Sequence, residues 1–476
     1  MNTHHGTRLG WLGLAAAALL AAGAPGARAA GNSITDEGVP LVTNGPLDIN
    51  VFGRAQMIGV GEYVPDPVRD NQRVYLFLKQ ARLGFRGSYK DLFTYETQFA
   101  FGGEDANGSN TDLSLLDFVA DVPLKPLGDG VALKVGQFRV PFGRENLTDR
   151  GYMDFGDRSI ASMATYQGRD YGLALLARRG PWTGTVGTFS AGGRDVPQRY
   201  LPERVGIPEL VARVGYDDGV DQDVYHVVGE DRDLTRTTKA AYLSALYTHD
   251  TQIGHSTPLL VHTIDKNLLI DTNYNPYLNE GGPGGDTNAG YGGHSVGSAD
   301  ALQRGDMWDL GADAVVRHPL GGGRAVEGEV EAAWGGYQNR FGVLHIAAAR
   351  AQGDYQFGAF GVGLRYALLS MDKKSGYLNA DPKPTPATAK GATSVNARMG
   401  QPIHELTPAL AWHVRGNNLK VVADLPLYFD CPTFLDPSLG VYAFPDPTAV
   451  DEVTVSGGAT QRHTVAEARL LFQFLF

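Results

Sequence analysis

Hydrophobic and polar residues alternate along much of this chain with a period of two. In residues 47–57 the apolar side chains share one face of an extended chain, and the polar ones, including Arg54 and Gln56, share the other. This alternation predicts a β-strand with one apolar side and one wet side. Residues 74–90 repeat the pattern, with one face made of Tyr75, Phe77, Ala81, Leu83, Phe85 and Tyr89 and the other of Gln80, Arg82, Arg86 and Ser88.

Sixteen segments of this character follow one another along the chain. They are expected at 47–57, 74–90, 92–103, 111–124, 131–141, 170–179, 182–192, 239–250, 258–270, 307–318, 324–337, 342–357, 359–371, 403–414, 418–429 and 464–476. In 131–141, Lys134 and Arg139 fall on opposite faces unless a bulge intervenes. The 62 Gly and 26 Pro also suit a chain of many strands and turns better than a chain of helices.

The gaps between these segments alternate between short turns and long loops. The short ones are 90–91, 125–130, 180–181, 319–323, 358 and 415–418, and the long ones are 63–73, 193–238, 271–306, 372–402 and 430–463. Short turns at one end and long loops at the other are typical of outer-membrane barrels with an even number of strands. The sequence therefore predicts an all-β protein, a transmembrane antiparallel up-and-down β-barrel of about 16 strands.

The two faces of the predicted strands differ as a membrane barrel requires. In 324–337 the carboxylates of Glu327, Glu329 and Glu331 form one row, opposite apolar side chains, so this row is expected to face a water-filled lumen. These acids either attract cations or pair with basic residues on neighbouring strands, and we favour the pairing. The last strand places Leu470, Phe472, Phe474 and Phe476 on one face and Glu467, Arg469 and Gln473 on the other.

One long insertion, 143–169, interrupts the strand pattern and has no sustained repeat. It contains charges of both signs spaced among aromatic residues: Arg144, Glu145, Asp149, Arg150, Asp154, Asp157, Arg158 and Arg169. An insertion of this length within a compact domain is usually functional or disordered, and this composition favours an ordered functional loop. We interpret it as the third external loop of the barrel, folded inward to constrict the pore.

The N-terminus has the features of an export signal. Basic and polar residues precede an apolar stretch from Leu9 to Ala24, and 27–29 form an A-x-A cleavage pattern, so 1–29 are expected to be a signal peptide. Residues 30–46 would then be a short periplasmic segment, and 47–476 the barrel. Removing the peptide leaves 39 basic residues against 52 acidic ones, a net charge of −13. Such an acidic chain is a poor nucleic-acid binder.

No motif for catalysis, metal binding or a cofactor is present. The chain has no G-x-S-x-G, no H-E-x-x-H and no C-x-x-C, and its one cysteine excludes an internal disulfide. The acidic stretch 229–233 lacks the spacing of an EF-hand. We therefore expect no enzyme, no metal and no cofactor, although a hydrolase site built from separate strands stays open.

Three stretches of this sequence are similar to a known family. VGQFRVPFGRENLTDRG (135–151), DRSIAS (157–162) and GRDYGLAL (168–175) resemble the phosphate-selective porins O and P. The resemblance implies a sixteen-stranded homotrimeric barrel in the outer membrane, with an inward third loop and arginines along an anion path. The last strand, which is aromatic and stops on Phe476, resembles the signal that the barrel-assembly machinery reads in outer-membrane proteins.

Six arginines are the candidates for constriction or anion binding. Four lie within the matching stretches and two on strand 74–90: Arg139, Arg144, Arg158, Arg169, Arg82 and Arg86. Guanidinium groups bind oxyanions through paired hydrogen bonds, which would replace part of the hydration shell of a passing anion. The alternative is that Arg144, Arg158 and Arg169 pair with Glu145, Asp157 or Asp170 and pin the loop. Arg82 and Arg86 could equally be solvated wall residues.

The sequence thus predicts a porin in the outer membrane of a Gram-negative bacterium. It would let small hydrophilic solutes diffuse passively, with anions such as phosphate or polyphosphate preferred, and would contact outer-membrane lipid and lipopolysaccharide. The negative net charge leaves a general or cation-tolerant porin as an alternative. A structural or adhesive barrel with a closed pore is the other alternative.

Overall fold

The structure is a computed structural model of the full chain. It describes residues 38–43, 46–64, 71–103, 113–165, 168–190, 209–219, 236–251, 305–339, 342–371, 402–436, 441–443 and 461–476. The expected signal peptide, 1–29, lies outside these ranges. Within them, no helix is long and apolar enough to cross a membrane.

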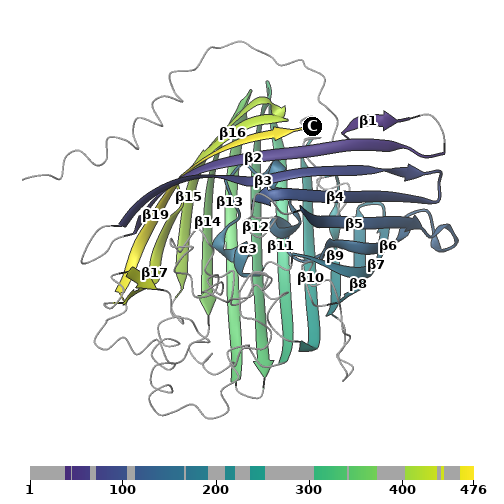
Figure 1. The fold of residues 1–476 in the computed structure, drawn as a ribbon. Helices are drawn as coiled ribbons and strands as arrows, with labels where there is room; N and C mark the ends of the chain where they lie inside the picture. The colour runs from purple at the N-terminus through teal and green to yellow at the C-terminus, as the bar shows by residue number, and fades with distance from the viewer. Residues whose placement is uncertain are drawn as a thin grey trace, which may run out of the picture.

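The described residues form a closed antiparallel β-barrel (Figure 1). Its strands are β2 (Ile49–Val64), β3 (Asn71–Tyr89), β4 (Phe93–Gly103), β5 (Leu113–Pro123), β6 (Val131–Arg139), β7 (Arg169–Arg179), β8 (Trp182–Phe189), β9 (Glu209–Asp217), β10 (Thr238–Thr251), β11 (Gly305–Gly321), β12 (Arg324–Asn339), β13 (Gly342–Phe357), β14 (Phe360–Met371), β15 (Ile403–Asn417), β16 (Leu419–Asp424), β17 (Leu427–Asp436) and β19 (Gln461–Leu475). The ring closes where β19 pairs with β2. Because β16 and β17 share one position beside β15 and β19, the described ring has 16 members, which confirms the predicted fold.

Two short strands lie outside this ring. β1 (Val39–Val42) pairs with β2 at the end that β19 leaves free, and β18 (Val441–Ala443) pairs with the far end of β17. The expected periplasmic segment 30–46 therefore contributes a strand to the sheet. A short 3₁₀ helix, η2 (Lys125–Leu127), lies in the turn between β5 and β6.

Apolar side chains cover the outside of the barrel and polar ones line the inside. On β12, Val330 and Trp334 are about half exposed, whereas Glu331 is buried on the opposite face. On β19, Phe472 and Phe474 are exposed, and Glu467, Arg469 and Gln473 are buried. This arrangement is the reverse of a water-exposed globular protein and is what a barrel in hydrocarbon requires. It confirms the two faces expected from the alternation.

One expected face changes within β3. The sequence pattern placed Phe77 on the apolar outer face with Leu83 and Phe85, but the structure places Val74 and Leu76 outside and packs Phe77 against a buried cluster. The cause is a shift in pairing between β2 and β3 at Gln56, and a second between β3 and β4 after Gln80. Such bulges reverse the alternation, so that Lys79 and Gln80 are both buried.

The eighth member of the ring is a strand that the sequence pattern missed. Residues 193–238 were expected to form one long loop, yet β9 lies within them, with Leu210 and Val214 outside and Arg213 inside. The charged residues around this short alternating run concealed it. Since β10 pairs directly with both β9 and β11, the ring closes without 258–270, a predicted strand outside the described residues.

The expected alternation of short and long connections also needs correction. With β9 present, residues 218–237 join β9 and β10 at the end that otherwise carries short turns. At the opposite end only residues 340–341 separate β12 from β13. The remaining described turns follow the predicted pattern, because an up-and-down barrel places every second connection at the same end.

Lys134 and Arg139 are both buried, and no bulge between β6 and β7 separates them. Lys134 faces the lumen, 3.1 Å from Asp121. β5 pairs with β6 only as far as Gln137, and beyond this point Arg139 turns to the insertion. Gly136, with φ +131°, sits where a Cβ would lie 2.0 Å from the carbonyl oxygen of Phe118, so the strands approach closely there.

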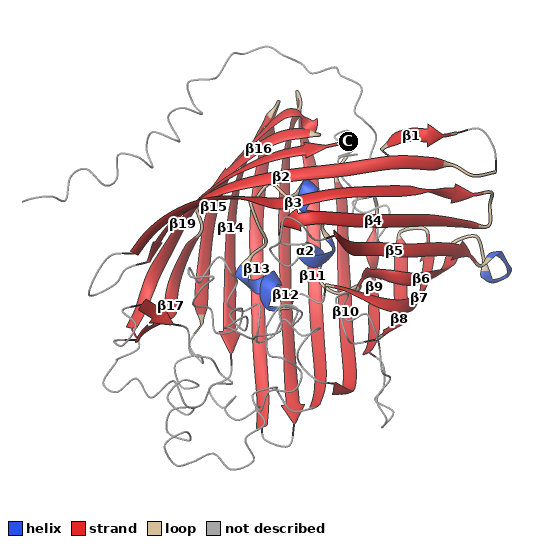
Figure 2. Ribbon diagram, viewed as in Figure 1, coloured by secondary structure: helices blue, strands red, loops and turns tan. Residues whose placement is uncertain are grey.

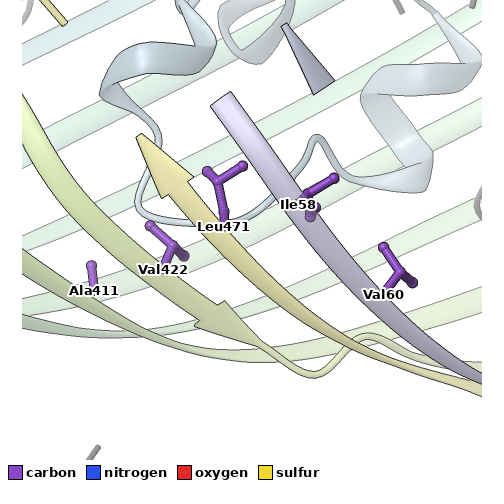
Figure 3. Packing of buried hydrophobic residues seen from close by; sticks show 5 residues of the cluster. All are labelled: Ile58, Val60, Ala411, Val422 and Leu471. Carbon is purple, nitrogen blue, oxygen red and sulfur yellow. The ribbon is translucent and has the colours of Figure 1, made fainter. Parts of the chain in front are cut away.

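The lumen wall also has an apolar patch on β2, β15, β16 and β19. Figure 3 shows its five side chains pointing to the side on which the helical turns of the insertion lie. They are Ile58, Val60, Ala411, Val422 and Leu471. A patch of this kind inside a polar lumen indicates that part of the lumen is filled by protein rather than by water.

Candidate functional site: the segment that crosses the lumen

The insertion between β6 and β7 folds into the barrel. It forms three short helical turns, α2 (Arg144–Leu147), η3 (Arg150–Tyr152) and α3 (Ile160–Ala164). Figure 2 shows α2 and α3 within the outline of the strands. Ser159 caps α3 by accepting a hydrogen bond from the amide of Ser162 at 3.2 Å, as expected of serine at this position. We call residues 140–168 the crossing segment.

Glu145 anchors the start of the crossing segment to three strands. Its Oε1 accepts a hydrogen bond from Arg365 of β14 at 3.2 Å, and Arg350 of β13 lies 3.6 Å from its Oε2. Its backbone amide donates to Glu331 of β12 at 3.0 Å. Ser159, at the other end of the segment, donates its hydroxyl to Oε2 at 2.6 Å. One carboxylate therefore ties the segment to the wall and to itself.

These contacts keep Glu145 ionised. Burial alone would raise the pKa of its carboxyl, but Arg350, Arg365 and the Ser159 hydroxyl lower it to about 2. A buried carboxylate that lacked such partners would take up a proton instead. The anchor is therefore charged at any pH at which a bacterium grows.

Arg365 joins the two halves of the crossing segment to the wall. It donates to Glu405 of β15 at 2.9 and 2.7 Å and to the carbonyl of Asp157 at 2.8 Å, and its guanidinium lies 4.6 Å from the centre of the Phe155 ring. Glu405 in turn accepts from the amide of Ile160, the first residue of α3, at 2.8 Å. A carboxylate at this position satisfies an amide that has no partner within the helix.

A third anchor surrounds residues 156 and 157. Lys79 of β3 forms an ion pair with Asp157 and donates to the carbonyl of Gly156 at 3.0 Å. The amide of Gly156 donates to Asp424 of β16 at 2.7 Å, and Asp424 is held by Arg469 at 2.7 and 2.8 Å. The ring closes between β19 and β2, and strands on both sides of this junction therefore hold the same turn of the segment: β3 on one side, and β16 and β19 on the other.

Side chains of the wall also satisfy backbone carbonyls of the segment. Lys420 donates to Met153 at 2.7 Å, and Gln473 donates to Gly151 at 2.8 Å. His413 lies 3.3 Å from the carboxylate of Asp154. Buried carbonyls need hydrogen-bond donors, and these polar wall residues supply them to the crossing segment.

Asp149 is surrounded by arginines of three strands. Arg54 of β2 forms an ion pair with it, Arg139 of β6 lies 3.1 Å away, and Arg82 of β3 lies 3.8 Å away. Its Oδ1 also accepts from the amide of Gly151 at 2.7 Å. Burial would raise the pKa of Asp149, but the three arginines hold it well below its usual range. We call Arg54, Arg82 and Arg139 the arginine trio.

Glutamines complete the surroundings of the trio. Arg82 donates to Gln98 at 3.3 Å. With its amide in the orientation that satisfies both ends, Gln80 accepts from Arg82 at 2.9 Å and from Arg150 at 3.2 Å, and donates to Gln56 at 3.0 Å. Neutral amides therefore hold the guanidinium group of Arg82 in place beside Asp149.

The remaining candidate arginines are each engaged. Arg144 donates to Asp313 of β11 at 3.0 Å, and Arg169 holds Asp117 of β5 in a fork with contacts of 2.9 Å. Arg158 donates to the carbonyls at the end of α2, at 3.0 Å for Glu145 and Thr148 and 3.3 Å for Asn146. The loop arginines therefore have structural partners, but Asp313 and Asp117 take the place of the expected Asp157 and Asp170.

Arg86 and the row of acids on β12 lie on the wall. Arg86 stacks 3.8 Å from the centre of the Phe52 ring and lies 3.8 Å from Glu96. Glu327 pairs with Arg317 directly opposite on β11, and Arg350 on β13 holds both Glu329, at 2.8 Å, and Glu331, at 3.0 Å. Each acid of this row therefore lies within ion-pair distance of an arginine on a neighbouring strand.

The sequence did not identify most of the wall residues that hold the segment. Five basic residues of the wall lie on separate stretches of the sequence, and they form no motif with one another: Lys79, Arg350, Arg365, Lys420 and Arg469. Their alternation marks them as lumen-facing, but only the closed barrel shows that they converge. No group of acidic, histidine and cysteine side chains able to hold a metal ion occurs among the described residues.

One lumen-facing carboxylate on the opposite wall lacks a partner. Glu209 of β9 is 1% exposed, and its Oε1 has no hydrogen bond within the described structure. Asp170 and Asp309 are near enough to repel it electrostatically. The same strand also carries Arg213, which donates to Asp313 of β11 at 2.7 and 3.1 Å, so acids and arginines occur together on this wall.

Comparison with known proteins gives a family and a set of similar folds. Residues 56–200 match the model of the phosphate-selective porin O and P family, consistent with the resemblance seen in the sequence. No curated protein matches this chain.

Among solved structures, OmpT of Vibrio cholerae is 7% identical, with a TM-score of 0.48, over 91% of this chain and 99% of its own. The outer membrane channel DcaP of Acinetobacter baumannii is 10% identical, with a TM-score of 0.45, over 91% and 99%. OprB of Pseudomonas putida is 12% identical, with a TM-score of 0.45, over 90% and 94%.

The low pKa of Glu145 predicts how the anchoring of the crossing segment depends on pH. Since the folded pKa of about 2 lies below the ordinary 4.5, the stabilisation is complete above about pH 4.5 and is lost as the pH falls towards 2. Glu145→Gln should lower the free energy of unfolding by about 3 kcal/mol at pH 7, because it removes one partner of buried ion pairs. The difference from wild type should vanish near pH 2.

Guanidinium titrations of the detergent-solubilised protein at the two pH values measure this difference. Glu96→Gln is the control, because Glu96 lies on the wall and pairs with Arg86 at 3.8 Å. A difference between wild type and Glu145→Gln that is the same at both pH values would contradict the assignment.

Proposed function

We propose that this chain, whose residues 56–200 are related to the phosphate-selective porins O and P, is an outer-membrane porin for small hydrophilic solutes with a preference for anions. The crossing segment supports the proposal most strongly. A loop that enters a closed barrel, and is bonded to the wall at several heights of its path, sets the diameter and the charge of whatever passage remains. Diffusion through it needs no energy source or cofactor.

The arginine trio gives this passage its preference. Three guanidinium groups from β2, β3 and β6 converge on one carboxylate of the segment, so positively charged groups gather at this part of the constriction. Guanidinium forks match the paired oxygens of phosphate and sulfate. We therefore add Arg54 to the candidate site and assign it, with Arg82 and Arg139, to anion binding. The other three loop arginines are assigned to holding the segment: Arg144, Arg158 and Arg169.

A cation-tolerant porin is the second candidate. The excess of acidic over basic residues in the chain favours this function, because acids that line a pore attract cations. The two candidates share the fold and the constriction, and they differ in the sign of the selectivity.

The cellular setting follows from the same proposal. We propose that residues 1–29 are removed on export, that the short turns face the periplasm, and that lipid and lipopolysaccharide surround the apolar exterior. The phenylalanine at position 476 ends an outward-facing row of aromatic side chains, which suits recognition by the barrel-assembly machinery. A homotrimer is proposed as well, and one of the similar solved structures is a trimer form of OmpT.

The sign of the selectivity follows from the trio. Wild-type protein in a planar bilayer should give a reversal potential of anion-selective sign across a potassium chloride gradient. Arg54→Gln should reduce the ratio of anion to cation permeability roughly fivefold, because one charge about 4 Å from an ion in a water-filled path contributes about 1 kcal/mol. Arg179→Gln, at an exposed position in the outward-facing row of Leu173 and Leu175 on β7, should leave the ratio unchanged. A cation-selective wild type would favour the second candidate.

The size of the passage follows from the crossing segment. Replacing residues 144–166 with a short glycine and serine linker should raise the single-channel conductance at least about twofold, because the lumen of a sixteen-membered barrel is wide. Retention of the heat-dependent shift on gels would show that the variant barrel still folds. Unchanged conductance would mean that the segment is not the constriction.

Assembly can be tested separately. In mild detergent without heating, the protein should migrate as a trimer and, on heating, as a monomer. Chemical crosslinking should give the same trimer band before heating. A monomer under both conditions would contradict the proposed assembly.

A further inference from the structure

A cavity of about 930 Å³ lies on the lumen side of the barrel wall, at the end where most of the short turns occur. Residues of β1 form one side of it, residues of β7 and β8 form the other, and β2 to β6 lie between them. Gly38, just before β1 and with φ +83°, lies where a Cβ would be 2.3 Å from the carbonyl oxygen of Val51. This close approach holds the N-terminal strand against β2 as a wall of the cavity.

Charged side chains of both signs line this cavity in equal number. They are three acids and three bases: Asp48, Glu96, Asp121, Arg86, Lys134 and Arg178. Asp121 and Lys134 lie 3.1 Å apart, and Arg86 and Glu96 lie 3.8 Å apart. A mobile anion or a mobile cation meets attraction and repulsion together here, so charge alone favours neither. A molecule that carries both charges can be matched at both of its ends.

Asp48 presents a carboxylate to the cavity in a fixed position. Its Oδ2 accepts a hydrogen bond from the hydroxyl of Ser88 at 3.0 Å, and its backbone amide donates to the carbonyl of Ser88 at 2.9 Å. The hydroxyl of Tyr95 donates to its backbone carbonyl at 3.0 Å. A hydroxyl donor orients a carboxylate without neutralising it. The half-buried Asp48 therefore suits an ammonium group, which forms charge-assisted hydrogen bonds with carboxylates.

Asn50 and Arg86 lie beside Asp48. They are directly opposite one another on β2 and β3, two residues along from the pair of Asp48 and Ser88. Both line the cavity, and 28% of the Arg86 side chain is exposed. A guanidinium and a carboxamide both donate hydrogen bonds to a carboxylate.

The spacing of these groups matches one amino acid. Two residues along a strand lie about 7 Å apart on the same face. An α-ammonium and an α-carboxylate group, with a hydrogen bond of about 2.9 Å at each end, span a similar distance. One molecule can therefore contact Asp48 at one end and Arg86 with Asn50 at the other.

Apolar side chains form another part of the cavity wall. They come from β1, β5, β6 and β7: Pro40, Val42, Val119, Ala132 and Leu176. An apolar group of a solute that packs against them is removed from water, which is favourable. The volume of the cavity lies within the range of about 300 to 1,000 Å³ that is usual for small-molecule sites, and such sites combine apolar walls with a few placed polar groups.

From these observations we propose that the cavity binds zwitterionic α-amino acids with an apolar side chain. The α-ammonium group contacts Asp48, the α-carboxylate contacts Arg86 and Asn50, and the side chain lies against the apolar wall. The site goes beyond the proposed function, because its solute has no net charge and because no residue of the arginine trio lines the cavity. No covalent change is involved.

The decisive experiment measures binding directly. Radiolabelled leucine is equilibrated by dialysis with the purified full-length protein in detergent, and unlabelled molecules are added as competitors. Isocaproate has the same side chain without the ammonium group, and isoamylamine has it without the carboxylate. Each should displace the label at least about tenfold more weakly than unlabelled leucine, because each meets only one end of the site.

Two nearly isosteric substitutions change the charge of the site in opposite directions. Asp48→Asn removes the partner of the ammonium group, while its amide oxygen can still accept from Ser88. Asn50→Asp places a negative charge against the carboxylate. Both should weaken leucine binding about tenfold. A cavity that merely attracts cations would instead bind isoamylamine more weakly in Asp48→Asn and more tightly in Asn50→Asp, with leucine unchanged in both.

The matched control is Asp91→Asn. Asp91 is an exposed acid in the turn that follows β3, and it does not line the cavity. This variant should change leucine binding by less than about twofold. The heat-dependent gel shift of a folded barrel is checked for every variant, and if Asp48→Asn fails to show it, Asp48→Ser takes its place in the same dialysis.

Leucine binding that Asp48→Asn and Asn50→Asp both weaken, and that the control leaves in place, supports the proposal. Three results overturn it: folded wild-type protein that binds no leucine at millimolar concentration, binding that either substitution leaves unchanged, and displacement by isoamylamine or isocaproate as effective as by leucine. The ion selectivity of the channel is measured separately in the bilayer, so any of these results leaves the proposed function in place.

Discussion

The pairing of buried carboxylates on one segment with cations of the barrel wall is the interaction on which the inside of this protein depends. Glu145, Asp149 and Asp157 carry the contacts, and each meets guanidinium or ammonium groups from separate strands. A charge buried without a partner would cost several kcal/mol. The segment can therefore lie in the lumen only where the wall supplies these cations, and this requirement fixes its path.

That requirement in turn restricts the wall. Each cation must project inward at the right height, while the same strands present apolar side chains to lipid. In β3 the alternation shifts at Lys79 and Gln80, and the shift brings Lys79 to Asp157. The apolar patch around Leu471 is a further example of a wall adapted to the segment, because these inward-facing side chains contact protein instead of water.

The same cations also serve the solute in the function that we propose. A porin with an arginine constriction needs positive charge along its path, yet the segment that forms the constriction is held by positive charge. Arg144 and Arg169 pair with carboxylates of the wall, and Arg144 shares its partner Asp313 with Arg213. The trio converges on Asp149, a carboxylate of the segment itself, and this is why we assign anion binding to the trio.

The sequence by itself determined the fold class and most of the strands, because a strand with one face in lipid and one in the lumen must alternate residue by residue. It also marked 143–169 as an interruption of the strand pattern, because no repeat continues through these residues. It missed β9 and the reversed face at Phe77, since a short charged run and a bulge both disturb the alternation on which such predictions rest.

Only the tertiary structure decided which charges meet. Arg54, Arg82 and Arg139 lie far apart in the chain, and nothing in their spacing indicates a common partner. Closure of the ring brings their strands to one side of the lumen, and the path of the crossing segment delivers Asp149 to them. Contacts between residues so distant in sequence depend on register, strand order and loop path together, and these are properties of the whole barrel.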